Sequence, residues 1–179
     1  MPKRINIVGA AGTGTTTLGR ALADRLGYPL IEADDCFWVP TDPPFLQMRS
    51  PADRQALLGA ALDPQKEWVL SGSVCGWGDF AIPVFDLVVF LWVPPAVRMA
   101  RLAARQSAQF GEPALAPGGA MHAQHTLFMN WAAAYDRGGL EQRSRKVHEL
   151  WLRVLRCPVL RIEGTPTVDE SLAQIARHG

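Results

Sequence analysis

A glycine-rich segment near the start of the chain most constrains its fold. The segment contains Gly9, Gly12, Gly14 and Gly19. It follows the apolar run 5–8 and precedes leucines and alanines that recur at helical spacing as far as Leu26. This order predicts a strand, a glycine loop and a helix that begins near Thr15. A strand joined so closely to a helix is typical of an α/β fold with parallel strands.

The spacing of these glycines is typical of a phosphate-binding loop. Backbone N–H groups of such a loop turn inward, and the following helix adds the positive end of its dipole, worth about 0.3 to 2 kcal/mol toward an anion. In the usual loop a lysine then reaches the β- and γ-phosphates. Thr15 occupies that position here, so a charge-assisted contact worth roughly 1.5 to 3 kcal/mol is missing. We therefore expect a positive charge from elsewhere in the chain.

Two other interpretations of the loop compete with phosphate binding. It could be only a tight strand-to-helix connection, although its glycines and paired threonine hydroxyls exceed what a tight turn needs. It could also bind a dinucleotide, because Gly12-Thr13-Gly14 begins that fingerprint and Glu32 lies near the expected acidic position. Thr17, however, stands where the third glycine of the fingerprint belongs. Phosphate binding therefore accounts for more of the segment than either alternative.

Composition limits the classes of protein to which the chain can belong. Its 179 residues, 48% of them hydrophobic, suffice for one well-buried domain and are too few for two ordinary ones. With 18 basic and 17 acidic residues the net charge is +1, which offers no general attraction for nucleic acid or an anionic membrane. Three cysteines without CxxC spacing suggest neither a disulfide framework nor a zinc site. We expect a cytoplasmic protein, either a monomer or a homodimer.

Two carboxylates follow the second expected strand, residues 30–33. Asp34 and Asp35 would then lie at the carboxyl end of a parallel strand, at the edge of the sheet where ligands bind. An aspartate there can accept a proton from a substrate hydroxyl or hold magnesium through water. The alternative is that the pair only caps a helix or forms a turn.

The next segment, 36–45, combines aromatic residues with prolines and predicts an ordered loop. Trp38 and Phe45 could stack on a flat substrate, while Arg49 and Arg54 could bind an anion. Equally, the aromatics could only pin the loop to the core. Ser50 before Pro51 predicts the start of a helix through Leu62. This helix would close over a second substrate, distinct from the ligand whose phosphates the glycine loop holds.

The third strand, 68–70, leads into another glycine-containing segment. Candidate substrate residues in it are Ser71, Gly72, Ser73 and Trp77. Ser71 stands where many phosphate-loop enzymes have a magnesium-holding aspartate. A hydrolase with Ser73 as nucleophile is disfavoured, because no histidine and acid partner is evident in chain order.

The stretch 86–93 lacks alternation and predicts a central strand covered on both faces. The helix after it has Arg98, Arg101 and Arg105 on one face, and these are the first candidates for the charge missing from the loop. A solvated helix face is the alternative. We expect residues 106–119 to be a mobile excursion.

The remaining residues predict a helix around 128–135, another over 140–155, a last strand over 157–162 and a closing helix over 168–176. Arg143 and Arg145 fall near the start of the helix over 140–155, where positive charge opposes the helix dipole. A bound polyphosphate would offset that cost.

In the order of its elements the chain resembles the nucleoside monophosphate kinase group, which includes adenylate, shikimate and gluconate kinases. More closely, residues 12–18 and 68–73, Trp131 and the pair Tyr135-Asp136 look like a bacterial adenylate kinase-like group of P-loop ATPases. The resemblance implies a three-layer α/β sandwich with a five-stranded parallel sheet, the phosphate loop after the first strand and a helical lid after the fourth. It implies one domain over 1–179, with a substrate-binding insertion at about 36–62 and a lid at about 98–146.

The same resemblance implies roles for residues. Arg98, Arg101 and Arg105 would belong to the lid, and Thr16, with Asp34, would hold Mg²⁺. The phosphates of ATP would lie against Gly9, Ala10, Ala11, Gly12, Thr13, Gly14, Thr15, Thr16 and Thr17.

These features leave three functions open. The first is a kinase that uses ATP and Mg²⁺ to phosphorylate a small-molecule acceptor, with Asp34 or Asp35 as base or metal ligand. The second is a nucleotide-binding sensor or ATPase that transfers no phosphoryl group, suggested by Thr15 and Ser71. The third is a nicotinamide-binding oxidoreductase. None of them involves nucleic acid or a membrane.

Overall fold

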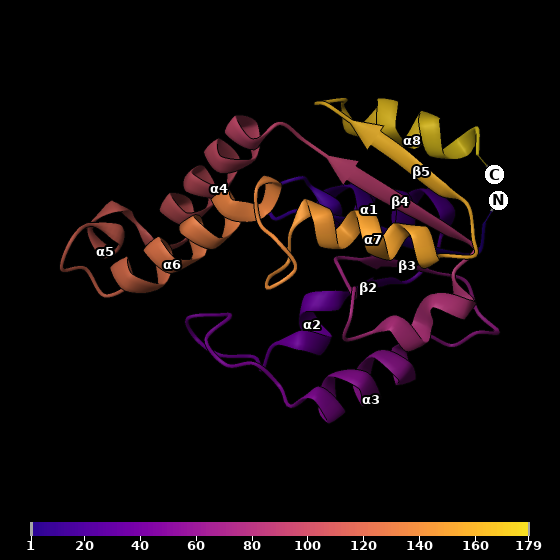
Figure 1. The fold of residues 1–179 in the computed structure, drawn as a ribbon, viewed down its shortest axis with the longest axis horizontal. Helices are drawn as coiled ribbons and strands as arrows, with labels where there is room; N and C mark the ends of the chain where they lie inside the picture. Colours follow the sequence, from indigo (N-terminus) through magenta and orange to yellow (C-terminus); the bar gives the residue numbers. More distant parts are fainter. Residues whose placement is uncertain (1, 179) are drawn as a thin grey trace.

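The computed structural model describes residues 2–178 as an α/β fold around one parallel sheet (Figure 1). The sheet has five strands in the order β2-β3-β1-β4-β5, and every neighbouring pair runs parallel. The strands are β1 (Arg4–Gly9), β2 (Leu30–Glu32), β3 (Trp68–Ser71), β4 (Leu87–Trp92) and β5 (Val159–Glu163). The predicted α/β fold with a five-stranded parallel sheet is therefore confirmed.

Helices cover both faces of the sheet. The α-helices are α1 (Thr15–Leu26), α2 (Ala33–Phe37), α3 (Pro51–Ala61), α4 (Pro95–Phe110), α5 (Glu112–Leu115), α6 (His122–Ala133), α7 (Arg145–Val154) and α8 (Val168–Ala176). Two 3₁₀ helices, η1 (Asp79–Val84) and η2 (Ala134–Asp136), complete the described elements. Ser50 caps α3 by accepting a hydrogen bond from the Asp53 amide, as Ser50-Pro51 predicts.

The three layers follow from the alternation of side chains along the buried strands. In β4, Leu87, Val89 and Leu91 pack with α1 and α8 on one face of the sheet. Val88 and Phe90 pack with α3, η1 and α7 on the other face. The strand has no alternation of hydrophobic and polar residues because both of its faces are covered.

The strand order also bears on the dinucleotide alternative. In the classic dinucleotide-binding fold the first strand lies beside the second, in the order 3-2-1-4-5-6. Here β3 lies between β1 and β2. The topology therefore differs from that of the nicotinamide-binding fold.

Three boundaries differ from the sequence prediction. Residues 33–37 form the short helix α2, so β2 ends earlier than expected and the predicted loop begins at Trp38, which forms an isolated bridge with Met48. Residues 106–119 are not one irregular excursion, because α4 continues to Phe110 and α5 follows it. Helix α7 begins only at Arg145, where the Ser144 hydroxyl caps it, so Arg143 precedes the helix.

Helices α4, α5 and α6 extend beyond one end of the sheet, and the segment between α2 and α3 reaches out at the same end (Figure 1). We call α4 to η2 the lid and residues 38–50 the acceptor loop. The division into an insertion at 36–62 and a lid at 98–146 stays a prediction. Within residues 2–178, no helix combines the length and apolarity that crossing a lipid bilayer requires.

Candidate functional site

The glycine loop between β1 and α1 has the backbone of an anion cage. Gly12 and Gly14 adopt φ values of 82° and 94°, which favour glycine over residues with a side chain. A Cβ on Gly9 would lie 2.6 Å from Thr13 Oγ1 and 2.7 Å from the Leu91 carbonyl oxygen. Thr13 is buried, and its hydroxyl donates to the Ala10 carbonyl at 2.8 Å. These constraints hold the loop in one tight conformation.

The first turn of α1 points its unpaired donors toward this loop. Gly14 caps the helix without a side-chain hydrogen bond, and no acidic residue lies in the first turn. The first N–H groups of a helix lack partners within it, and the helix dipole makes them attract anions. Thr15 and Thr16 are partly exposed beside these donors. The cage is thus present without the lysine.

A cavity of about 220 Å³ adjoins the loop. Thr13, Gly14 and Thr17 line one side of it, and Arg101 of α4 lines another. The segment 164–166 after β5 completes the wall. Sequence reasoning missed that segment, although Gly164 and Pro166 directly after the last strand were a signal for a turn at the ligand-binding edge of the sheet.

Arg98 does not face the cleft, so its assignment as a lid residue that contacts phosphate was wrong. Its side chain is fully buried, and its Nη2 pairs with Asp136 Oδ2 at 2.5 Å. Nη1 donates to the carbonyl oxygens of Ala11 at 3.2 Å and Ala132 at 3.5 Å. The acidic partner comes from η2, so helical spacing within α4 could not reveal it. Arg101 and Arg105, by contrast, are exposed on α4.

Asp34 and Asp35 lie in the first turn of α2, directly after β2. Asp34 reaches solvent, yet enough protein surrounds it that desolvation raises the pKa of its carboxyl. The positive charges of Arg143 and Arg105 oppose that rise in pKa, and the neighbouring Asp35 adds to it. The carboxylate of Asp34 therefore lies within electrostatic range of two arginines, Arg105 of α4 and Arg143 just before α7.

Gly72 fixes the position of α2. Its φ is 103°, and a Cβ there would lie 2.9 Å from the Cβ of Ala33. The start of α2 therefore rests directly on the backbone after β3. This contact places the first turn of α2, which contains Asp34, beside the ends of β2 and β3.

Arg143 has few protein partners. Desolvation lowers the pKa of its guanidinium, while the charge of Asp34 opposes that change. The guanidinium carbon lies 5.6 Å from the Trp131 ring centre, and within residues 2–178 Arg143 forms no ion pair. The guanidinium of Arg143 is therefore a partly desolvated cation whose charge no ion pair neutralises within the described residues.

Arg145 is less available than the sequence suggested. Its guanidinium carbon lies 5.0 Å from the centre of the Trp92 ring, and its Nε is 4.0 Å from Glu149. These contacts with Trp92 and Glu149 offset the unfavourable charge at the start of α7. The placement of Arg145 therefore does not require a bound polyphosphate.

Aromatic side chains form a wall between the acceptor loop and the loop after β3. The Phe37 ring packs edge-on against Trp38 at 5.2 Å and Trp77 at 5.6 Å, and Trp38 in turn packs against Phe45 at 6.0 Å. The Arg54 guanidinium lies 3.8 Å from the Phe37 ring centre. Sequence reasoning missed Phe37, which joins these residues.

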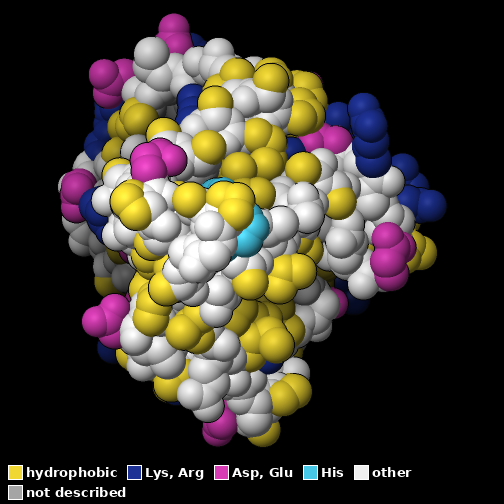
Figure 2. Space-filling model, turned by 90° about the vertical axis from the view of Figure 1, so that its left-hand side faces the viewer, with side chains coloured by type: hydrophobic (Ala, Val, Ile, Leu, Met, Phe, Trp, Pro, Cys, Tyr) yellow, Lys and Arg dark blue, Asp and Glu magenta, His cyan; other side chains and the backbone are white. Residues whose placement is uncertain are grey.

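The two arginines of this wall differ in their hydrogen bonding. Arg54 Nε donates to the Arg49 carbonyl at 2.8 Å. Arg49 has a buried Nε without a hydrogen-bond partner. Figure 2, which views the lid end, shows hydrophobic side chains spread across this face. Phe45 and Met48 of the acceptor loop and Leu127 of α6 are exposed hydrophobic residues.

The loop after β3 is joined to the lid by a buried histidine that sequence reasoning missed. Ser73 Oγ lies 2.9 Å from His148 Nε2, and the Tyr135 hydroxyl lies 2.8 Å from His148 Nδ1. Burial lowers the pKa of His148 to about 3 and raises that of Tyr135. A histidine does meet Ser73, contrary to expectation, but both are buried and the third partner is a tyrosine, so they form a structural link. Ser71 is also buried.

No group of three or more His, Cys, Asp or Glu side chains within residues 2–178 is arranged to hold a metal ion. The candidate oxygen ligands from the sequence are the Thr16 hydroxyl, at the start of α1, and the Asp34 carboxylate, in the first turn of α2. Hard oxygen ligands of this kind suit Mg²⁺, which is usually held by one or two protein groups together with the phosphates of a nucleotide.

The glycine loop between β1 and α1, together with the all-parallel sheet, gives the chain the fold seen in small-molecule kinases of the nucleoside monophosphate kinase-like group. A gluconokinase from Sinorhizobium meliloti shares the fold, with a TM-score of 0.55, 19% sequence identity and coverage of 99% of this chain and 93% of that chain. No protein-family model matches the chain.

The chain is also similar to YqaC of Bacillus subtilis, described as uncharacterized, with 43% identity over 175 residues that cover 98% of this chain and 96% of YqaC. It therefore belongs to the family of YqaC. A cytidylate kinase from Methanocorpusculum labreanum is 30% identical over 118 residues, which are 58% of this chain and 63% of that kinase.

Proposed function

We propose that the protein is a kinase that transfers the γ-phosphoryl group of ATP to a hydroxyl group of a small molecule. The observation that carries this proposal is the position of Asp34 in the first turn of α2, directly after β2, where the charges of Arg143 and Arg105 act on its carboxylate. The fold shared with a gluconokinase and the partial similarity to a cytidylate kinase support it.

ATP would bind on the side of β1 and β5. The N–H groups of the loop and of the first turn of α1 would hold its phosphates. The cavity between Arg101 and the segment 164–166 would take the base, with the planar guanidinium able to stack on it. Mg²⁺ bound with the nucleotide would neutralise phosphate charge, with Thr16 as its ligand from the loop.

The acceptor would bind between the aromatic wall and Asp34. Asp34 would accept the proton of the acceptor hydroxyl as that oxygen bonds to the γ-phosphorus and the bond to the bridging oxygen of ADP breaks. Its raised pKa brings the carboxylate closer to the pH at which it must act as a base. Arg105 and Arg143 would stabilise the charge on the transferred group. An acceptor phosphate is already ionised, so the setting of Asp34 favours a hydroxyl.

The test incubates the purified protein with ATP labelled on the γ-phosphate, Mg²⁺ and a panel of sugars, hydroxy acids and nucleoside monophosphates. A phosphorylated hydroxyl compound is the expected product. Asp34→Asn should then lower kcat by roughly 10² to 10⁴ while the Kd for ATP stays near the wild-type value. The adjacent Asp35→Asn is the matched control and should keep most of the activity. Phosphorylation of a nucleoside monophosphate that is insensitive to Asp34→Asn would contradict the proposed base.

A nucleotide-binding sensor or ATPase is a second candidate, favoured by Thr15 at the lysine position. Binding of ATP without transfer to any acceptor in the panel would support it over the kinase. Release of inorganic phosphate without an acceptor would identify the ATPase form.

A further inference from the structure

Arg98 is the largest charged side chain buried in the fold, and the proposed chemistry gives it no contact with substrate. It is fully buried, it pairs with Asp136, and its Nε has no hydrogen-bond partner. Asp136 also accepts a hydrogen bond from Trp92 Nε1 at 3.0 Å. A buried ion pair is often no more stabilising than apolar residues of the same size, and an unpartnered buried donor adds a further cost. Stability alone therefore does not account for an arginine here.

The contacts of Arg98 converge on the phosphate loop. Its Nη1 donates to the Ala11 carbonyl, within the loop, at 3.2 Å. In a trans peptide the carbonyl and the next N–H point in opposite directions. Because the Ala11 carbonyl points to Arg98, the Gly12 N–H points away from it. The loop also lies directly on the α4 backbone, since a Cβ on Gly12 would be 2.8 Å from the Arg98 carbonyl oxygen.

The same guanidinium joins this loop to the base of the lid. Its other acceptors are the Ala132 carbonyl in α6 and the Asp136 carboxylate in η2. Its carbon also lies 5.2 Å from the Tyr135 ring centre. A planar guanidinium with donors on both sides can make all of these contacts at once, whereas an ammonium group cannot.

We propose that Arg98 is a positioning residue that holds the peptide between Ala11 and Gly12 in the orientation that phosphate binding requires. Asp136 neutralises its charge, so Arg98 acts through the backbone of the loop and not as a second phosphate ligand. A loop that lacks the lysine depends on its backbone donors for phosphate contact, and the orientation of those donors is what Arg98 sets. The expected effect on ATP binding rests on the proposed function. The expected effect on the order of the loop does not.

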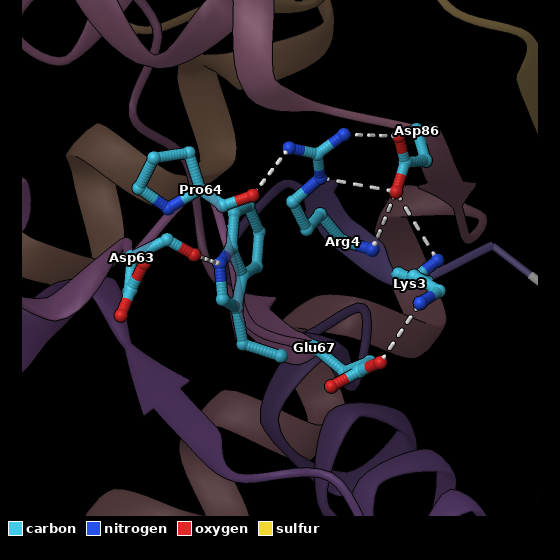
Figure 3. A network of polar contacts seen from close by, with 7 residues as sticks. Lys3, Arg4, Asp63, Pro64, Glu67 and Asp86 are labelled. Carbon is cyan, nitrogen blue, oxygen red and sulfur yellow. Dashed lines mark hydrogen bonds and ion pairs between the residues drawn. The ribbon is translucent and has the colours of Figure 1, made fainter.

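The main variant is Arg98→Met with Asp136→Asn, which leaves no unpaired charge in the core. Its control is Arg4→Met with Asp86→Asn, which removes another arginine–aspartate pair. Arg4 Nη2 and Asp86 Oδ1 are 2.8 Å apart at the start of β1 and just before β4 (Figure 3). These are the amino ends of the strands, opposite the phosphate loop.

The first measurement compares the Kd values of ATP and adenosine by titration calorimetry. The Arg98 variant should bind ATP at least tenfold more weakly and adenosine within twofold of wild type, since adenosine lacks the phosphates that the backbone donors of the loop would bind. The Arg4 variant should keep both affinities. Equal losses for ATP and adenosine would show a merely structural role and overturn the proposal. Arg98→Lys, which retains the charge but not the planar fork, should show the same selective loss if the double variant does not fold.

The second measurement needs no nucleotide. Hydrogen exchange of peptides covering residues 9–18 should be at least tenfold faster in the Arg98 variant and unchanged in the Arg4 variant. Unchanged exchange in the Arg98 variant would overturn the proposal. If the wild-type protein binds no ATP, the proposed function fails, and this comparison still decides whether Arg98 orders the loop.

Discussion

The buried histidine between the lid and the loop after β3 makes stability depend on pH in a predictable direction. His148 has no exposed surface, and desolvation together with the nearby charge of Arg143 lowers its pKa from the ordinary 6.5 to about 3. The folded protein therefore keeps this side chain neutral at pH values where the unfolded chain protonates it. The contribution of the neutral His148 side chain to the free energy of unfolding is complete above about pH 6.5, and it is lost progressively as the pH falls toward 3.

The magnitude follows from proton linkage. Each pH unit between the two pKa values costs about 1.4 kcal/mol of unfolding free energy for a single group. Between pH 8 and pH 5, His148 should therefore cost about 2 kcal/mol. Carboxylates also titrate toward the lower end of this range, so the contribution of His148 is the part that a non-titrating side chain removes.

Urea unfolding of wild type and His148→Gln at pH 8, 7, 6 and 5 measures that part. Glutamine can hydrogen-bond to Ser73 or Tyr135 but does not titrate, so the variant should lose about 2 kcal/mol less than wild type over this range. His125→Gln, in the lid helix α6, is the control and should follow wild type. If wild type and His148→Gln have parallel pH dependences, the histidine is not held neutral and the argument fails.

Three further predictions concern the nucleotide side of the site. Gly12→Ala should lower the melting temperature and weaken ATP binding at least tenfold, because its Cβ meets the α4 backbone; unchanged binding in calorimetry would refute this. Thr15→Lys should strengthen ATP binding about tenfold or more by adding a charge-assisted contact, and loss of binding would show that the loop fits another ligand. Arg101→Ala should weaken ATP and adenosine to a similar extent, since Arg101 lines the proposed base cavity; a loss confined to ATP would place it at the phosphates instead.

The sheet and the phosphate loop could be predicted from sequence because their signals are local. The glycines with the apolar run before them gave the loop, and the unbroken apolar stretch of β4 gave a strand covered on both faces. Ser50 and Pro51 gave the start of α3. Each of these features depends on residues within a few positions of one another.

The pairs that join distant segments could not be predicted. Arg98 was grouped with Arg101 and Arg105 by helical spacing, but its partner Asp136 lies 38 residues further along the chain. Ser73 was judged to lack a histidine because His148 comes 75 residues later. In both cases spacing gives the face of an element, and only the packing of elements decides whether that face meets solvent, a ligand or a buried charge.

The three arginines of α4 differ in their surroundings and in the roles that we propose for them. Arg98 is bonded to the phosphate loop, Arg101 lines the cavity beside it, and Arg105 contributes to the field at Asp34. Because Arg98 ties the first turns of α4 to the loop, those turns cannot move away without breaking the bond to Ala11. We therefore expect any closing motion of the lid to bend α4 beyond Leu102, which is buried against Gly12. Such a motion would bring Arg105 toward Asp34 while the loop stays in place. Closure of the lid would then supply the positive charge that is missing at Thr15, whereas the backbone cage of the loop would already be formed before closure.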